Sequence, residues 1–303
     1  MSDLFGSLVA QRDKYADDFY QLAQQDKSIL SNTVDAVSID AKRCVYDRIG
    51  TVNFNNIVSQ YQDTQYQEVE YSRRVLESVD KSYATMIDSR DTSRAQLSPQ
   101  SDILQNTIAA FNREKDKAIY NAAIGKATSL DSDNTTAQVA LPAGQVIAAN
   151  PGGGSNSNMT VDKIIDAIEV FGANDVDIIS EGGVLVLSSK QYQSLAKQDK
   201  FINGDFTRLT DGESLKAGIF GRFMGIPLVR ISNDLMKKTG NIRSCVMYTK
   251  KAIKYGELAG FNEVNIDKIP TKHNNIQILH KISLGATRMD EKRVVEIKCD
   301  ETA

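Results

Sequence analysis

The sequence predicts an α+β protein in which a compact α/β unit interrupts an elongated body of one long helix and long strands. Three observations lead to this prediction. Ser98 and Pro99 form a helix-start signal, and the helical pattern that follows continues as far as Ile124. Between about residues 150 and 260, short apolar strands alternate with helical segments, as in a unit with its own core. Two long strands then follow, and we expect both to pack against the long helix.

The composition of the 303 residues is that of a globular protein, with 41% hydrophobic and 25% charged residues. A formal net charge of −3 argues against a protein whose main task is to coat duplex nucleic acid, because such proteins are strongly basic. No apolar run is long enough to cross a membrane, and the first residues lack the pattern of a signal peptide. The scattered Cys44, Cys245 and Cys299 argue against a disulfide framework or zinc site and indicate a reducing cytoplasm.

The first 25 residues predict an amphipathic helix. Apolar residues recur there at intervals near three and four: Leu4, Leu8, Tyr15, Phe19 and Leu22. A helix at a chain end frays unless it docks on another element. Two interpretations stay open, a helix packed on its own domain and an arm that lies on a neighbouring subunit.

Residues 45–76 predict a long, polar hairpin that leaves the body of the fold. Residues 53–67 are rich in Asn, Gln and Tyr and poor in core aliphatics, and Gln67 to Val75 then alternate with period two. Both faces of this strand carry little apolar content, so it must gain stability from pairing or packing elsewhere. An ordinary surface hairpin folded back on its own domain is the alternative.

The long helix is expected over residues 99–124, which is roughly 39 Å at the rise of an α-helix. Gly125 is a candidate for its C-terminal stop. A helix of that length suits an elongated or plate-like body better than a sphere. We expect a buried stripe of Leu104, Ile108, Phe111, Ala118 and Ala122 and an outer face of Asn112, Arg113, Glu114, Asp116 and Lys117.

An α/β unit follows a break at residues 131–159, in which NPGGGSNSN is expected to be a flexible linker. Thr160 is expected to cap a helix that ends at Gly172, residues 184–187 to form a buried strand, and Ser189 to cap another helix. The two returning strands are expected to carry apolar faces of Ile276, Ile278, Ile282 and Leu284 in one and Val295, Ile297 and Cys299 in the other.

No motif for catalysis or cofactor binding is found. The sequence contains no phosphate-binding loop of either common spacing, no nucleophile elbow and no H-E-x-x-H motif. Asp131 and Asp133 begin an EF-hand-like pattern, but Thr136 and Pro142 occupy the positions that need Gly and Glu. His280 falls within an apolar strand face and is expected to be a hydrogen-bonded core residue. We therefore predict no catalytic, cofactor-binding or metal-binding residues.

A basic run without any acidic residue lies between positions 237 and 254. A solvated rim is the first interpretation, and a contact with an acidic subunit edge or with nucleic acid is the alternative. The basic residues are Lys237, Lys238, Arg243, Lys250, Lys251 and Lys254.

The order of these elements resembles that of the major capsid proteins of tailed bacteriophages, which have the Hong-Kong-97-like fold. The segment SPQSDILQNTIAAFNREKDKAIYNAAIGKA is similar to the spine-helix segment of one branch of that family, and TTAQVALPAGQVI follows it as expected. VLVLSSKQYQSLAKQDKF and GRFMGIPLVRISN resemble its apical segments, and ISLGATRMDEKRVVEIKCDE resembles its closing strands. These matches run from about residue 70 to the C-terminus.

The resemblance implies a structural, non-catalytic protein without cofactors that closes into an icosahedral shell of hexamers and pentamers around packaged double-stranded DNA. The shell would be assembled in the bacterial host cytoplasm and would contact no membrane. A separate scaffolding protein, a portal and an optional decoration protein are the implied partners, and no fused scaffolding segment is expected. The implied parts are an N-terminal arm (1–44), an extended loop (45–76), a peripheral domain (77–149 with the spine helix 99–124, and 263–303) and an apical domain (150–262).

Two other functions are weighed against this one. The first is an encapsulin-like bacterial nanocompartment shell, which has the same fold and encloses a cargo enzyme instead of DNA. The second is a soluble α/β enzyme, which would require a pocket of convergent polar groups that the sequence does not reveal.

Overall fold

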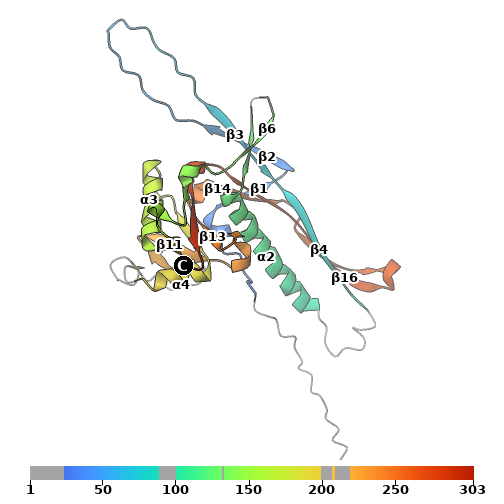
Figure 1. The fold of residues 1–303 in the computed structure, drawn as a ribbon. Coiled ribbons are helices and arrows are strands. Elements are labelled where there is room, and N and C mark those ends of the chain that lie inside the picture. The colour runs from blue at the N-terminus through green and yellow to red at the C-terminus, as the bar shows by residue number, and fades with distance from the viewer. Residues whose placement is uncertain (1–23, 89–99, 132, 199–206, 209–218) are drawn as a thin grey trace, which may run out of the picture.

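The computed structural model of the chain describes residues 24–88, 100–131, 133–198, 207–208 and 219–303 (Figure 1). Of the helix expected over the first 25 residues, only residues 24 and 25 are described, and they are not helical. The helix-start residues Ser98 and Pro99 also lie outside the described residues. The α-helices in the described part are α2 (Gln100–Ile124), α3 (Val161–Ala173) and α4 (Ser189–Ala196). None of these helices is both long and apolar enough to cross a membrane.

Short strands and single 3₁₀ turns make up the rest of the regular structure. The strands are β1 (Asp35–Ile39), β2 (Arg43–Ile49), β3 (Tyr71–Glu77), β4 (Val79–Ile87), β5 (Ala127–Leu130), β6 (Thr136–Val139), β7 (Val146–Ile147), β8 (Val184–Leu187), β9 (Thr207–Arg208), β10 (Ile219–Phe223), β11 (Ile226–Arg230), β12 (Lys238–Thr239), β13 (Ile242–Tyr248), β14 (Ile253–Leu258), β15 (Glu263–Ile269), β16 (Asn275–Arg288) and β17 (Val294–Asp300). The 3₁₀ turns are η1 (Ser31–Thr33), η2 (Ala143–Gln145), η3 (Pro151–Gly153), η4 (Asn233–Leu235), η5 (Lys250–Ala252), η6 (Pro270–Lys272) and η7 (Glu291–Arg293).

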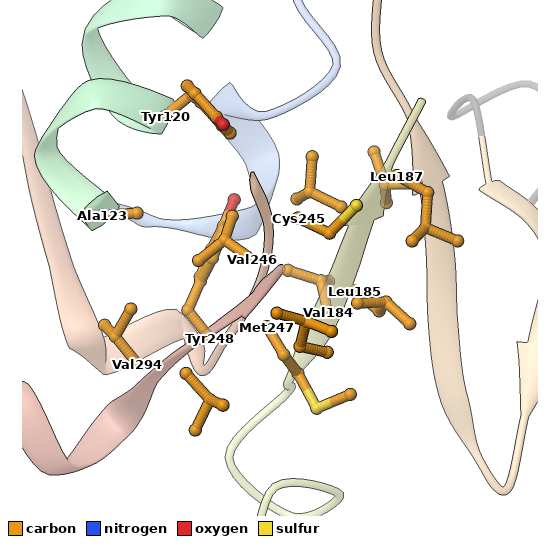
Figure 2. Packing of buried hydrophobic residues seen from close by; sticks show 14 of the residues in the cluster. Tyr120, Ala123, Val184, Leu185, Leu187, Cys245, Val246, Met247, Tyr248 and Val294 are labelled. Atoms are coloured by element: carbon orange, nitrogen blue, oxygen red, sulfur yellow. The ribbon is translucent and has the colours of Figure 1, made fainter. Parts of the chain in front are cut away.

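The largest sheet forms the core of the α/β unit. Its strand order is β7-β17-β13-β8-β11-β10-β9, and β12 pairs with β13. All four residues of β8 are buried, as the apolar run at 184–187 predicts. Figure 2 shows Leu185 of β8 and Val246 and Tyr248 of β13 in one apolar cluster with Tyr120 and Ala123 of α2. This cluster therefore joins the α/β unit to the long helix.

The two returning strands, β16 and β17, lie in different sheets. β16 lies along α2, as expected (Figure 1). The second returning strand, β17, pairs with β13 from Ile242↔Asp300 to Tyr248↔Val294 and shares one core cluster with residues of α2. β17 thus belongs to the large sheet, where the register with β13 buries six of its seven residues.

A second sheet is built around β16. Residues 276–284 of β16 pair with β4 on one edge, and its other edge pairs first with β15 and then with β14. β1 adds to β14 in parallel. The result is a long ribbon beside α2 that extends away from the large sheet (Figure 1). This arrangement gives the elongated body that the helix length predicts.

The long helix ends at Ile124, as predicted. A side chain at Gly125 would place its Cβ 2.5 Å from the backbone oxygen of Asn121, so only glycine fits there. The Gly125 N–H donates to that same oxygen at 2.7 Å and closes the last turn.

The expected burial pattern of the long helix is only partly right. Phe111, Ala118 and Ala122 are packed against the core, as predicted, but Ile108 is 45% exposed. A second buried face lies roughly a third of a turn away, because the chain that precedes β1 covers it. It includes Asp116, which the sequence places on the outer face and which is fully buried in the structure. This face consists of Ala109, Asp116, Ile119, Tyr120 and Ala123.

The helix caps of the α/β unit are largely as expected. The Thr160 side chain accepts a hydrogen bond from the Lys163 N–H at 3.3 Å and caps α3, which continues one residue past Gly172. The cap expected at Ser189 is wrong by one position, because Ser188 precedes α4 and its hydroxyl donates to the Gln191 side chain instead. The segment expected to be a flexible linker contains η3, and Asn156 within it donates to Asp300 at 3.0 Å.

Candidate assembly surface

The segment that joins β2 to β3 projects from the body as a long loop (Figure 1). Every residue from 51 to 68 is exposed. We call residues 50–70 the extended loop. Its sequence is polar, but large apolar side chains are spaced along both of its legs and are at least 86% exposed: Phe54, Ile57, Val58, Tyr61 and Tyr66. A protein that acts alone rarely exposes so many large apolar groups together, so this loop is the first candidate for a contact surface.

The hydrogen bonds of the extended loop are local. The Gly50 N–H donates to the Glu70 carbonyl at 2.8 Å, where the two legs leave the sheet. At the far end the Val58 N–H donates to the Gln62 side chain at 2.8 Å, and this closes a turn. Because both bonds lie within the loop, they hold its shape and leave its side chains available.

The predicted hairpin is confirmed at its base and shorter than expected beyond it. β2 and β3 pair antiparallel from Arg43↔Glu77 to Ile49↔Tyr71. The alternating pattern from Gln67 predicts a strand that begins earlier, but β3 begins only at Tyr71. The polar residues before Tyr71 have no ladder partner within the described chain, and an isolated two-stranded ribbon is marginal in water.

A small sheet anchors the loop to the body, with strand order β2-β3-β5-β6. Charged groups close the junction on one side. Glu291 in η7 forms ion pairs with Arg48 of β2, Arg74 of β3 and Arg288 of β16. Burial lowers the pKa of Arg74 and of Arg288, and the Glu291 carboxylate opposes that effect. The loop is thus attached to the ribbon by buried charge as well as by strand pairing.

Several side chains of α2 hold the root of the N-terminal segment: Asn112 and Arg113 donate to Asp26 and Gln24, each at 2.7 Å, and the buried Asp116 binds residues 25–30. Asp116 accepts hydrogen bonds from the N–H groups of Ile29 and Leu30 and from the Ser28 hydroxyl, the last at 2.6 Å. Gln25 also donates to it. Burial raises the pKa of Asp116, and these hydrogen bonds work in the opposite direction. The sequence offers no signal for this contact, because the partners lie 86 or more residues apart.

The residues singled out in the sequence have structural roles. His280 is buried, as expected, but the contact that holds its ring is aromatic: its centroid lies 5.4 Å from that of Phe111, at 68°. Burial lowers the pKa of His280, so burial favours the neutral ring. Asp131 lies in a turn, where its backbone N–H donates to the Thr135 carbonyl and its carbonyl accepts from the Asn134 N–H.

The basic run is largely neutralised by acidic residues of the same chain. Lys238 and Arg243 pair with Glu301, Lys251 pairs with Glu181, and Lys254 pairs with Asp35. Lys237 and Lys250 are exposed at the surface, in agreement with the interpretation as a solvated rim.

The cysteines and acidic residues form no metal centre within the described residues, where no group of three potential ligands occurs. Cys44 is half-buried, and Cys245 and Cys299 are buried in the adjacent strands β13 and β17. Burial raises the pKa of the Cys245 thiol, which keeps it protonated and unreactive.

The match to a protein family covers nearly the whole chain. The family described as phage capsid protein matches residues 9–301. The chain belongs to the phage capsid protein family. This capsid protein therefore assembles with copies of itself into a phage shell, and the extended loop is part of each subunit.

Solved phage structures share the fold of the capsid protein. A structure from Mycobacterium phage Che8 superposes with a TM-score of 0.68 at 16% identity and covers 99% of each chain. The capsid of Ralstonia phage GP4 gives a TM-score of 0.72 at 11% identity, with 99% of this chain and 98% of that chain covered. The mature capsid of bacteriophage PhiM1 gives 0.66 at 14% identity, with 98% and 96% covered. No curated protein gives a significant sequence match.

These comparisons confirm the α+β, Hong-Kong-97-like phage capsid fold that the sequence predicts. The capsid protein is a structural component of the virion. The family match favours this role over the nanocompartment shell and over the α/β enzyme.

Proposed function

We propose that this capsid protein closes into an icosahedral shell of pentamers and hexamers around packaged double-stranded DNA, and that the extended loop makes the contacts between neighbouring subunits. The loop carries the proposal, because its large side chains are almost fully exposed. Burying one such side chain contributes about 1.5–3 kcal/mol. Several of them, repeated around a ring of subunits, add up to a stable shell although each contact is modest.

The geometry of the loop suits a contact between different surfaces of two subunits. The loop projects away from the body of the subunit (Figure 1). Reaching out in this way, it would cover a different surface of the neighbouring copy. Such head-to-tail contacts close into rings when the rotation between copies is a whole fraction of a turn. Pentamers and hexamers from one chain require this kind of contact.

We propose that the chain divides as the sequence suggests, into an arm (1–44), a hairpin segment (45–76) that contains the extended loop, a peripheral domain (77–149 and 263–303) and an apical domain (150–262). The packing of α2 along β16 supports the peripheral unit. The pairing of β17 with β13 makes β17 the connection between the two domains, since it lies in the returning segment and in the large sheet.

We also propose that the protein catalyses no reaction and that its shell assembles in the host cytoplasm with a separate scaffolding protein, a portal and an optional decoration protein. Catalysis would need convergent polar groups with shifted pKa values in an accessible cavity. Strongly shifted groups among the described residues include the buried tyrosines Tyr120 and Tyr248 and the buried Cys245, whose pKa values are raised by burial, and Glu301, whose carboxylate is held in ion pairs. We propose that contacts to the packaged DNA are independent of its sequence.

Replacing residues 53–67 with a short Gly–Ser linker tests the role of the extended loop. The hydrogen bond between Gly50 and Glu70 lies outside the deletion, so β2 and β3 keep their pairing. We expect an unchanged thermal unfolding midpoint and no shells by negative-stain microscopy and sedimentation.

A matched pair of variants separates the apolar contacts from loop length. Phe54→Ser with Tyr61→Ser is expected to abolish assembly, whereas Gln60→Ser with Gln65→Ser, in the same loop, is expected to leave it intact. Normal shells from the deletion variant would show that the loop is not the subunit contact.

A further inference from the structure

The junction between the extended loop and the body contains a cluster of four charged side chains. Arg48 and Arg74 come from β2 and β3, at the base of the loop, while Arg288 and Glu291 come from the end of β16 and from η7. The exposed fractions of the four side chains are low, between 0% for Arg288 and 26% for Arg48. The cluster therefore lies inside the junction and not on its surface.

Glu291 is the carboxylate that all three guanidinium groups share. Its Oε1 lies 2.5 Å from Nη2 of Arg74 and 3.6 Å from Nε of Arg288, and its Oε2 lies 3.3 Å from Nη1 of Arg48. Arg48 also donates to the Met289 carbonyl at 2.6 Å. Glu291 thus connects the two strands of the loop base to the end of the ribbon.

Arg288 extends the connection to the long helix. Its guanidinium donates to the carbonyls of Ala123 and Gly125, at the end of α2, and to the carbonyl of Val139 in β6. These carbonyls are groups that a helix end and an edge strand leave unpaired. One side of the cluster is therefore rigidly attached to the body, and the other side carries the loop.

The cluster has more positive charge than its single carboxylate can balance. Among the described residues, Nε and Nη1 of Arg74 and Nε of Arg288 are buried without a hydrogen-bond partner. Asp290, the next acidic group along the chain, is committed to Arg293 at 3.3 Å. Removing the carboxylate charge of Glu291 is expected to destabilise the junction strongly, because the guanidinium groups around it would stay buried without an opposite charge.

We propose that Glu291 is the positioning residue that fixes the direction of the extended loop relative to the body of the subunit. This inference rests on the proposed function, in which the loop must reach a fixed surface of a neighbouring copy. Each leg of the loop has about ten residues and spans roughly 30 Å when extended. A rotation of roughly 10° at the base therefore moves the tip by roughly 5 Å, which is enough to lose a packed contact.

Spin labels on free, unassembled subunits measure the direction of the loop. One label is placed at the tip with Gln60→Cys, which leaves the bond between Val58 and Gln62 in place, and one on the exposed side of α2 with Asn121→Cys, in a Cys44→Ser background. Pulsed dipolar spectroscopy then gives the distribution of distances between the two labels. We expect one narrow distribution in the otherwise wild-type chain and a broad or multimodal one in Glu291→Gln, which keeps the shape of the side chain and removes its charge.

Glu181→Gln is the matched control. Glu181 also pairs with two basic side chains, Lys251 and Arg293, and its side chain is 17% exposed against 14% for Glu291, but it lies in the α/β unit. The control is expected to keep the narrow distribution. If Glu291→Gln does not fold, Arg48→Gln decides, because it removes one of the two loop-side contacts and leaves Glu291 with Arg74 and Arg288. An unchanged distribution in the folded variant would overturn the inference.

The assembly readout separates this inference from the proposed function. If the loop deletion still gives shells while Glu291→Gln broadens the distance distribution, the loop is not the contact and Glu291 nevertheless sets its direction. If the deletion abolishes shells while Glu291→Gln and Arg48→Gln leave the distribution narrow, the proposed function stands and the role of Glu291 is wrong.

Discussion

The carboxylate of Asp116 accepts a hydrogen bond from the backbone N–H of Leu30 at 3.0 Å, and both residues are fully buried. The N–H of Ile29 donates to the same carboxylate at 3.1 Å. A buried carboxylate is costly unless its lone pairs are used, and here backbone and side-chain donors from one short segment use them. Asp116 is therefore the buried part of a contact between the long helix and this segment to which Asn112 and Arg113 add hydrogen bonds nearer the surface.

We predict that Asp116→Ala loosens the attachment of residues 28–30 to α2. The N–H groups of Ile29 and Leu30 would lose their acceptor, and each stranded donor costs about 1–3 kcal/mol. A loss of about 3 kcal/mol in the free energy of unfolding is expected from urea titration, together with fast amide exchange over residues 25–30. Glu169→Ala, which removes an exposed acid from α3, is the control and should change neither. Slow exchange at Leu30 in Asp116→Ala would contradict the prediction.

A second prediction compares substitutions at a buried and at an exposed isoleucine of α2. Ile119 is fully buried, whereas Ile108 is 45% exposed at the edge between the faces. Ile119→Asp should prevent folding, because an unpaired buried carboxylate costs several kcal/mol. Ile108→Asp should cost only about 1 kcal/mol, as surface substitutions do. Thermal melts of the two variants check this directly, and equal losses would mean that the helix has a different buried face.

Local patterns in the sequence predict much of the secondary structure, because helices and caps depend on neighbours in sequence. The end of the long helix at Gly125 and the cap of α3 at Thr160 are of this kind. The exposed loop could also be predicted, since its polar composition offers little to a core. Predicting the extended loop as a candidate contact surface required no knowledge of contacts between distant parts of the chain.

Long-range contacts could not be predicted from one sequence. Asp116 reads as an outer-face residue, because only the fold brings the N–H groups of residues 29 and 30 to it. The alternating pattern of β17 predicts a strand, but it does not identify β13 as the strand with which it pairs. Glu291 is one acidic residue among many in the sequence, and three strand or turn segments must meet before it has its partners.

The ion pairs of Glu301, near the C-terminal end, predict how the stability of the fold depends on pH. The Glu301 side chain is 2% exposed and pairs with Lys190 at 3.4 Å, with Lys238 at 2.7 Å and with Arg243. Burial alone would raise the pKa of Glu301, but the hydrogen bonds from Arg243 and Lys238 outweigh it and lower the pKa to about 2. These three partners come from α4, β12 and β13, so Glu301 ties the end of the chain to the large sheet.

A carboxylate with a lowered pKa in the folded state stabilises the fold above its unfolded-state pKa. The contribution of Glu301 is therefore fully present above an ordinary glutamate pKa of 4.5 and is lost as the pH falls toward about 2. We expect Glu301→Gln to lower the free energy of unfolding by about 1–3 kcal/mol near neutral pH, the range for hydrogen bonds to charged groups. The difference from wild type should shrink between about pH 4.5 and pH 2, as urea titrations across that window would show. Glu263→Gln, at an exposed position of β15, serves as the control. A difference that stays constant down to the lower pH would mean that the ion pairs of Glu301 do not hold the C-terminal strand in place.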